Sequence, residues 1–119
     1  MAESHFTDWL LQARTLSIRY LTLRWLLGQE ECDPAVAAAR QAMLTTGPIP
    51  AILAEQAADG RWAAERTFYT PKYTSSHWSL TLLAELALPA EDLRLRRGAA
   101  HVLQATAREL RHAQAAAEA

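Results

Sequence analysis

The sequence predicts an all-α fold of about five helices. Ala and Leu together make up 43 of the 119 residues, whereas Gly and Pro account for only 4 and 5. Apolar residues recur at steps of three and four along most of the chain, which is the spacing of amphipathic helices. We therefore expect residues 1–119 to form a single helical domain with one long aromatic loop, and residues 113–119 to fray.

Composition also limits the classes of function. The single cysteine, Cys32, excludes an internal disulfide and a multi-cysteine zinc site, and the four histidines are dispersed. A formal net charge of −1 favours neither nucleic acid nor an anionic membrane as partner. The chain has no run of about 18 apolar residues and no signal-peptide layout. We expect a cytoplasmic protein without a metal, a cofactor or a membrane span.

The first helix is expected to begin at Thr7 or Asp8, both good N-cap residues, and to end near Leu27, before Gly28. An apolar stripe with steps of three and four follows one side of it, namely Trp9, Ala13, Leu16, Tyr20, Leu23 and Leu27.

A second set of apolar residues lies on the other side of this helix. A helix that is apolar on two sides is normally sandwiched between layers or covered by a partner chain. We therefore expect an interface formed by Trp9, Ile18, Leu21 and Trp25.

The middle of the chain carries clear helix boundaries. Asp33 and Pro34 are a suitable N-cap and first residue for a helix over 35–44. The Gly-Pro-Ile-Pro sequence at 47–50 interrupts it, and a short helix follows as far as the Asp59-Gly60 turn.

Residues 58–75 are expected to form a long loop rich in aromatic residues, a kind of loop that is often functional. These residues either form a small core of their own or line a pocket for an isoprenoid-like or aromatic ligand, anchored by polar groups. The candidate ligand-binding residues are Trp62, Tyr69, Lys72, Tyr73, His77 and Trp78.

Two further helices complete the prediction. Ser75 or Ser76 caps a helix over 77–88, which is expected to direct Trp78, Leu82, Leu83 and Leu86 inward. Pro89 and the acidic residues after it begin the last helix, whose apolar stripe is Leu95, Ala99, Val102, Leu103 and Leu110.

One motif resembles the repeat of prenyltransferases and squalene/oxidosqualene cyclases. Gln56 is followed after three residues by Gly60, which Asp59 precedes, and then after one residue by Trp62. Residues 69–78, 82–86 and 19–28 are similar to bacterial proteins of this repeat class. The resemblance implies antiparallel helix hairpins of an α/α toroid. In such a repeat, Gln56 bonds to the start of the next helix, Gly60 makes the turn, and Trp62 packs beneath it.

The departures from this family are equally informative. Five helices cannot close a ring that typically has six hairpins, and we therefore expect an open segment: an N-terminal fragment, a truncated homologue or an engineered module. The acidic Asp-x-Asp-Asp motif of the cyclases is absent, and the aspartates are scattered singly. We accordingly assign no catalytic residue.

These observations favour a non-catalytic helical module that binds a hydrophobic small molecule or a partner chain and forms a homodimer through its first and last helices. Residues 29–65 carry six acids against two arginines, and residues 92–111 carry five arginines against two acids, which either guides self-association or reflects solvated helix faces. Two alternatives remain open: a terpenoid-cyclase- or prenyltransferase-like enzyme assembled by oligomerisation, and a purely structural or engineered assembly unit.

Overall fold

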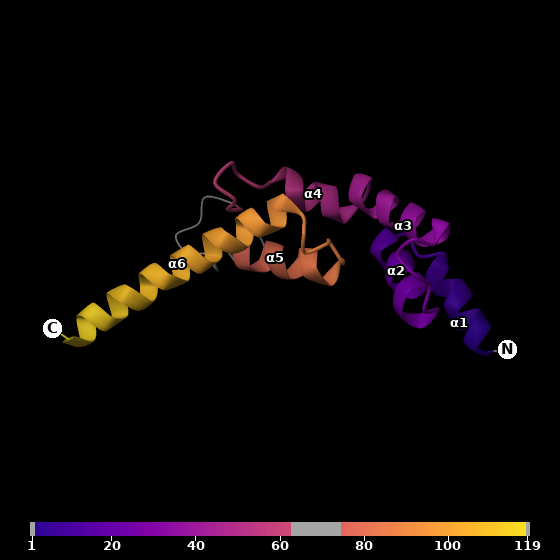
Figure 1. The fold of residues 1–119 in the computed structure, drawn as a ribbon, viewed down its shortest axis with the longest axis horizontal. Helices are drawn as coiled ribbons and strands as arrows, with labels where there is room; N and C mark the ends of the chain where they lie inside the picture. Colours follow the sequence, from indigo (N-terminus) through magenta and orange to yellow (C-terminus); the bar gives the residue numbers. More distant parts are fainter. Residues whose placement is uncertain (1, 63–74, 119) are drawn as a thin grey trace. The chain divides into compact units, whose positions relative to one another are not determined.

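The computed structural model describes residues 2–62 and 75–118, with side chains from residue 5 onward. It confirms the all-α prediction: over these residues the regular structure is helical, and the β-type pairing is a single bridge between Gln56 and Trp62. The chain forms two compact units, unit 1 over Met1–Ile52 and unit 2 over Leu53–Ala119, and the division falls within α4, Pro48–Ala54. Figure 1 shows the helices of each unit.

Unit 1 contains a group of short helices that contact one another. Helix α2 packs on α3 and on η1, a π-helical segment, and α1 contacts both α2 and η1. The bounds are α1, Ala2–Leu11; α2, Leu16–Leu21; η1, Thr22–Leu26; and α3, Pro34–Thr45.

The expected continuous first helix is wrong, because the chain breaks between α1 and α2. Thr7 and Asp8 lie inside α1 and do not cap it. At the break, the Arg19 Nε donates to the Ala13 carbonyl at 2.8 Å. This bond gives a hydrogen-bond donor to a backbone carbonyl that lies between the two helices. The apolar stripe has the same spacing on both sides of the break and therefore did not reveal it. Gly28 does end the segment, with a φ of +64°.

Helix α3 begins as the sequence predicts. The Asp33 carboxylate accepts from the Ala35 N–H at 2.9 Å, and Pro34 is the first helical residue. Val36 and Met43 on this helix are buried, together with Leu23 of η1. The Ser17 hydroxyl donates to the Met43 sulfur at 3.7 Å, so the core of unit 1 includes a satisfied polar contact between α2 and α3.

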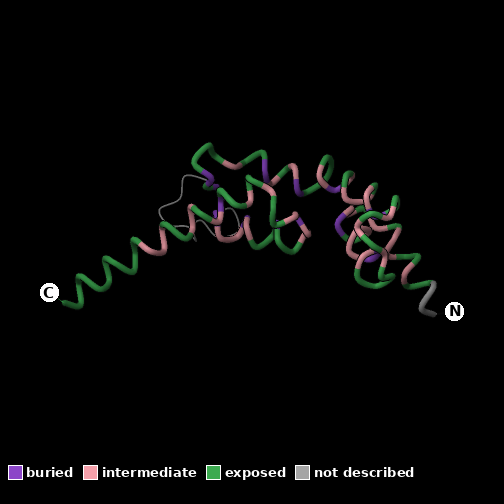
Figure 2. Tube along the Cα trace, in the orientation of Figure 1, coloured by how far each residue is buried: buried purple, intermediate pink, exposed green. Residues whose placement is uncertain are grey.

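Unit 2 contains α5, Ser76–Glu85, which packs against α6, Leu93–Glu118. Ser75 is the N-cap residue of α5, and both Ser75 and Ser76 are buried. Leu83 and Leu88 join the core, but Leu82 is 42% exposed, which corrects its predicted inward position. Figure 2 shows that the second half of α6 is largely exposed, and Leu110 there is exposed. Leu103, in the first half of this helix, is also exposed.

Candidate functional site

An apolar pocket of about 320 Å³ opens on unit 1 where α1 ends and α2 begins. Trp9 and Ile18 line it, together with Leu10, Gln12 and Ala13. The break after α1 forms this pocket, because it turns the chain so that Ile18 stands near the preceding helix. The indole of Trp9 is 68% exposed and stacks on Phe6, with ring centroids 6.1 Å apart.

A second group of exposed apolar side chains belongs to η1 and the residue after it. Trp25 is 72% exposed, and Leu26 and Leu27 are also exposed. The Arg24 guanidinium stands 5.4 Å from the centre of the Trp25 ring, a cation–π arrangement that holds the indole on the surface. Of the four predicted interface residues, Trp9, Ile18 and Trp25 are therefore exposed, and Leu21 is half-buried. The Trp9 pocket brings together only Trp9 and Ile18 of these four.

A second pocket of unit 1, of about 360 Å³, was not anticipated from the sequence. Leucines from α1, α2 and η1 form one side and alanines of α3 the other, with Arg19 as the charged group in the lining. The sequence signal was weak, because Arg19 is one of several arginines in the first 40 residues and nothing local distinguishes it.

A polar cluster around Glu31 ties three elements of unit 1 together. The Tyr20 hydroxyl of α2 and the Arg40 guanidinium of α3 donate to the two carboxylate oxygens, and Arg24 Nε lies 2.9 Å from Oε1. The hydrogen bond from Tyr20, together with the charges of Arg24 and Arg40, lowers the pKa of Glu31. Burial and the bond to Glu31 raise the pKa of Tyr20. Arg24 and Arg40 compensate the charge of Glu31 within the cluster, and we therefore assign the cluster a structural role.

The Gln56–Gly60–Trp62 motif forms a tight turn in unit 2. Gln56 Nε2 donates to the Gly60 carbonyl at 2.9 Å and to the Arg94 carbonyl of α6 at 2.8 Å. Gly60 has a φ of +97°, and a Cβ there would stand 2.6 Å from the Arg97 carbonyl oxygen. Asp59 pairs with Arg61 within the turn. Gln56 therefore joins the turn to the first residues of α6, two helices further along the chain than α4.

Trp62 lies in the core of unit 2 and is only 1% exposed. Its backbone N–H donates to the Ser76 hydroxyl at 3.0 Å. A Cβ at Gly98 of α6 would stand 2.6 Å from the Trp62 ring, so this glycine allows the indole to lie directly on the helix. The ring is covered by protein and offers little surface to a ligand.

The other candidate ligand-binding residues do not form a described site. His77 and Trp78 are half-buried, with ring centroids 5.5 Å apart in an edge-to-face arrangement. Tyr69, Lys72 and Tyr73 lie outside the described residues. In the ranges 2–62 and 75–118, no three His, Cys, Asp or Glu side chains are grouped to hold a metal ion. Nor does any helix in that part of the chain combine the length and apolar character that crossing a membrane requires.

Comparison of the chain with protein-family models, with curated proteins and with solved structures finds no match.

Proposed function

We propose that this chain is a non-catalytic helical module that binds a hydrophobic small molecule or partner chain through the apolar surface of unit 1, and that it self-associates through the same surface. The observation that carries the proposal is the Trp9 pocket, whose two predicted interface residues, Trp9 and Ile18, are both exposed. Exposed Trp25 of η1 adds a second apolar group to unit 1.

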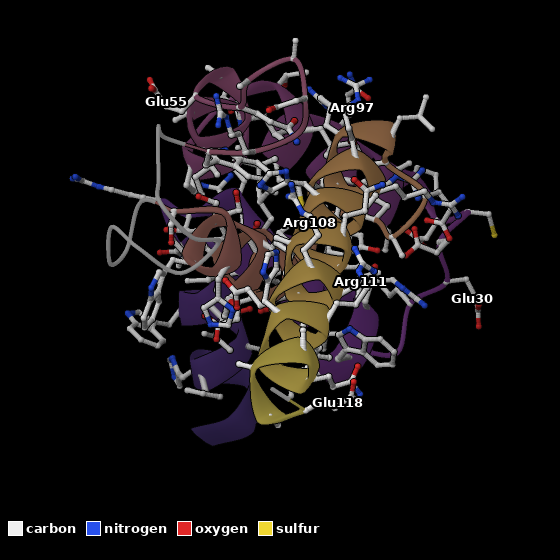
Figure 3. All side chains as sticks on the ribbon, turned by 90° about the vertical axis from the view of Figure 1, so that its left-hand side faces the viewer. Glu30, Glu55, Arg97, Arg108, Arg111 and Glu118 are labelled. Atoms are coloured by element: carbon white, nitrogen blue, oxygen red, sulfur yellow. The ribbon has the colours of Figure 1, made fainter. Side chains whose placement is uncertain are left out.

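Energetics support a role for this surface in binding. Large aromatic residues are enriched where proteins meet partners, because each removes a large apolar area from water. At about 25 cal/mol per Å², covering a few hundred Å² of apolar surface contributes several kcal/mol to association. A second copy is the favoured partner, since the acidic segment 29–65 of one molecule complements the basic segment 92–111 of another. Arg108 and Arg111 of that basic segment project from α6 and are exposed (Figure 3).

A relationship to the α/α-toroid repeat is part of the same proposal. The turn at Gln56, Gly60 and Trp62 supports it, since the glutamine reaches a helix carbonyl and the tryptophan is buried against Gly98 of that helix. An open segment of such a toroid leaves apolar helix surface for a partner to cover.

Sedimentation equilibrium between about 1 and 100 µM tests self-association. We expect a dimer, and we expect Trp9→Ser combined with Trp25→Ser to weaken it at least about tenfold without unfolding the chain, because both indoles are exposed. Leu82→Ser is the matched control, because it removes an exposed apolar side chain from α5. A compact wild-type monomer over the whole range would contradict self-association.

A further inference from the structure

The second pocket of unit 1 combines apolar walls with one positive charge. Leu11 of α1, Leu16 of α2 and Leu23 of η1 line one side, and Arg19 of α2 also belongs to the lining. The opposite wall is made by α3, where Ala35, Ala38, Ala39 and Ala42 lie at helical spacing on one face. The volume of about 360 Å³ is within the range of small-molecule sites, about 300–1,000 Å³.

Among the described residues, Arg19 has no carboxylate partner, in contrast to Arg24 and Arg40 of the same unit. Arg24 and Arg40 both pair with Glu31, whereas Arg19 uses Nε to bond the Ala13 carbonyl. This bond holds the guanidinium in place and leaves the two Nη groups for another acceptor. Arg19 as a residue is half-buried beside apolar walls, and such surroundings strengthen the attraction of its charge for an anion.

The geometry of the two Nη groups limits the kinds of anion that Arg19 can bind. A planar guanidinium can offer one N–H from each Nη to the two oxygens of a carboxylate in a bidentate pair. A single guanidinium neutralises one negative charge, which fits a monocarboxylate better than a phosphate dianion. The surrounding leucines and alanines offer only apolar contacts to the rest of the ligand.

We propose that this pocket binds an aliphatic monocarboxylic acid, with its carboxylate on Arg19 and its hydrocarbon chain between α3 and the leucines of α1, α2 and η1. The site is separate from the Trp9 pocket, and neither the residues nor the ligand class depend on self-association.

Titration of the full chain with decanoate, and with decanol as the uncharged equivalent, tests the proposal by calorimetry and by NMR of labelled alanine methyl groups. We expect decanoate to shift the Ala38, Ala39 and Ala42 signals and to bind at least about tenfold more tightly than decanol. Arg19→Gln should remove that preference, and Arg19→Lys should restore part of it. Arg14→Gln is the matched control, because Arg14 is an exposed arginine outside the pocket lining.

The proposal would be overturned by equal binding of decanoate and decanol or by a preference that survives in a folded Arg19→Gln variant. Alanine shifts confined to Ala13, which lines the Trp9 pocket, would also overturn it. Circular dichroism establishes that each variant is folded. The Trp9→Ser/Trp25→Ser variant should still bind decanoate, so loss of dimerisation and loss of this site are distinguishable. A titration with decyl phosphate tests the class of ligand. Tighter binding of decyl phosphate than of decanoate would contradict the proposal of a monocarboxylic acid.

Discussion

Units 1 and 2 place the same residue type in opposite environments. In unit 2, Trp62 is 1% exposed, whereas in unit 1 Trp9 and Trp25 are 68% and 72% exposed. The difference lies in what each indole packs against. In unit 2, Gly98 allows the Trp62 ring to reach the backbone of α6. The bond from Gln56 to the Arg94 carbonyl holds the turn on that helix. Unit 2 therefore uses Trp62 for stability, and unit 1 leaves its two exposed indoles available for binding.

The contrast extends to polar groups. Unit 2 joins its turn to α6 through a bond from Gln56 to the Arg94 backbone carbonyl, which is fixed in position once the helix forms. Unit 1 joins its helices through side chains around Glu31, whose carboxylate is partly exposed. Bonds to partly exposed ionic groups contribute less because water competes for them. We therefore expect unit 2 to depend strongly on a few residues and unit 1 to tolerate substitution at its surface.

The largest expected effect is the difference between tryptophan substitutions in the two units. Trp62→Ala should lower the free energy of unfolding of unit 2 by about 3–5 kcal/mol, because it leaves a cavity in the core. Trp25→Ala should change that of unit 1 by less than about 0.5 kcal/mol in a monomer. Hydrogen exchange read by mass spectrometry measures the two units separately. Similar losses of unfolding free energy in the two variants would contradict this difference between the units.

A smaller effect is expected where α6 approaches the Trp62 ring. Gly98→Ala should destabilise unit 2 by about 1–3 kcal/mol, since the added methyl would stand 2.6 Å from the buried ring. Ala100→Gly on the exposed side of α6 is the control, and it should cost about 1 kcal/mol through helix propensity alone. Urea unfolding measures both variants.

The effect of Gly98→Ala on the free energy of unfolding should depend on the Trp62 ring. In a Trp62→Ala variant the added methyl group no longer clashes with that ring, and Gly98→Ala should become neutral or stabilising. Stabilisation by Gly98→Ala in the otherwise wild-type chain would show that the indole does not lie against this glycine.

The smallest effect is expected at Glu31. Glu31→Gln should cost unit 1 about 1 kcal/mol near neutral pH, because it weakens the bonds to Arg24 and Arg40. The folded pKa is lowered, so this contribution is present above the ordinary glutamate pKa of about 4.3 and is lost as pH falls through the folded value. The wild-type advantage should thus disappear in acid. Glu30→Gln, at an exposed neighbouring carboxylate, should show no comparable loss in urea unfolding between pH 3 and 7.

Local boundaries were predictable because they depend on a few adjacent residues. Asp33 accepts from the Ala35 N–H at the start of α3, as an N-cap aspartate does. Gly28 and Gly60 take positive φ where the sequence places an end and a turn. In contrast, the apolar spacing does not encode the break after Leu11, where the Arg19 Nε bonds to the Ala13 carbonyl six residues away.

The amino-acid sequence by itself determined the helical class, the helix start at Asp33 and the glycine-dependent turns, because each follows from backbone preferences over a few residues. Tertiary structure alone decided which tryptophans are buried and which arginine lines a pocket. The physical reason is that an indole or a guanidinium has the same intrinsic character at every position. Its role depends on the surface that other helices bring to it, such as the bare backbone at Gly98 or the alanine face of α3.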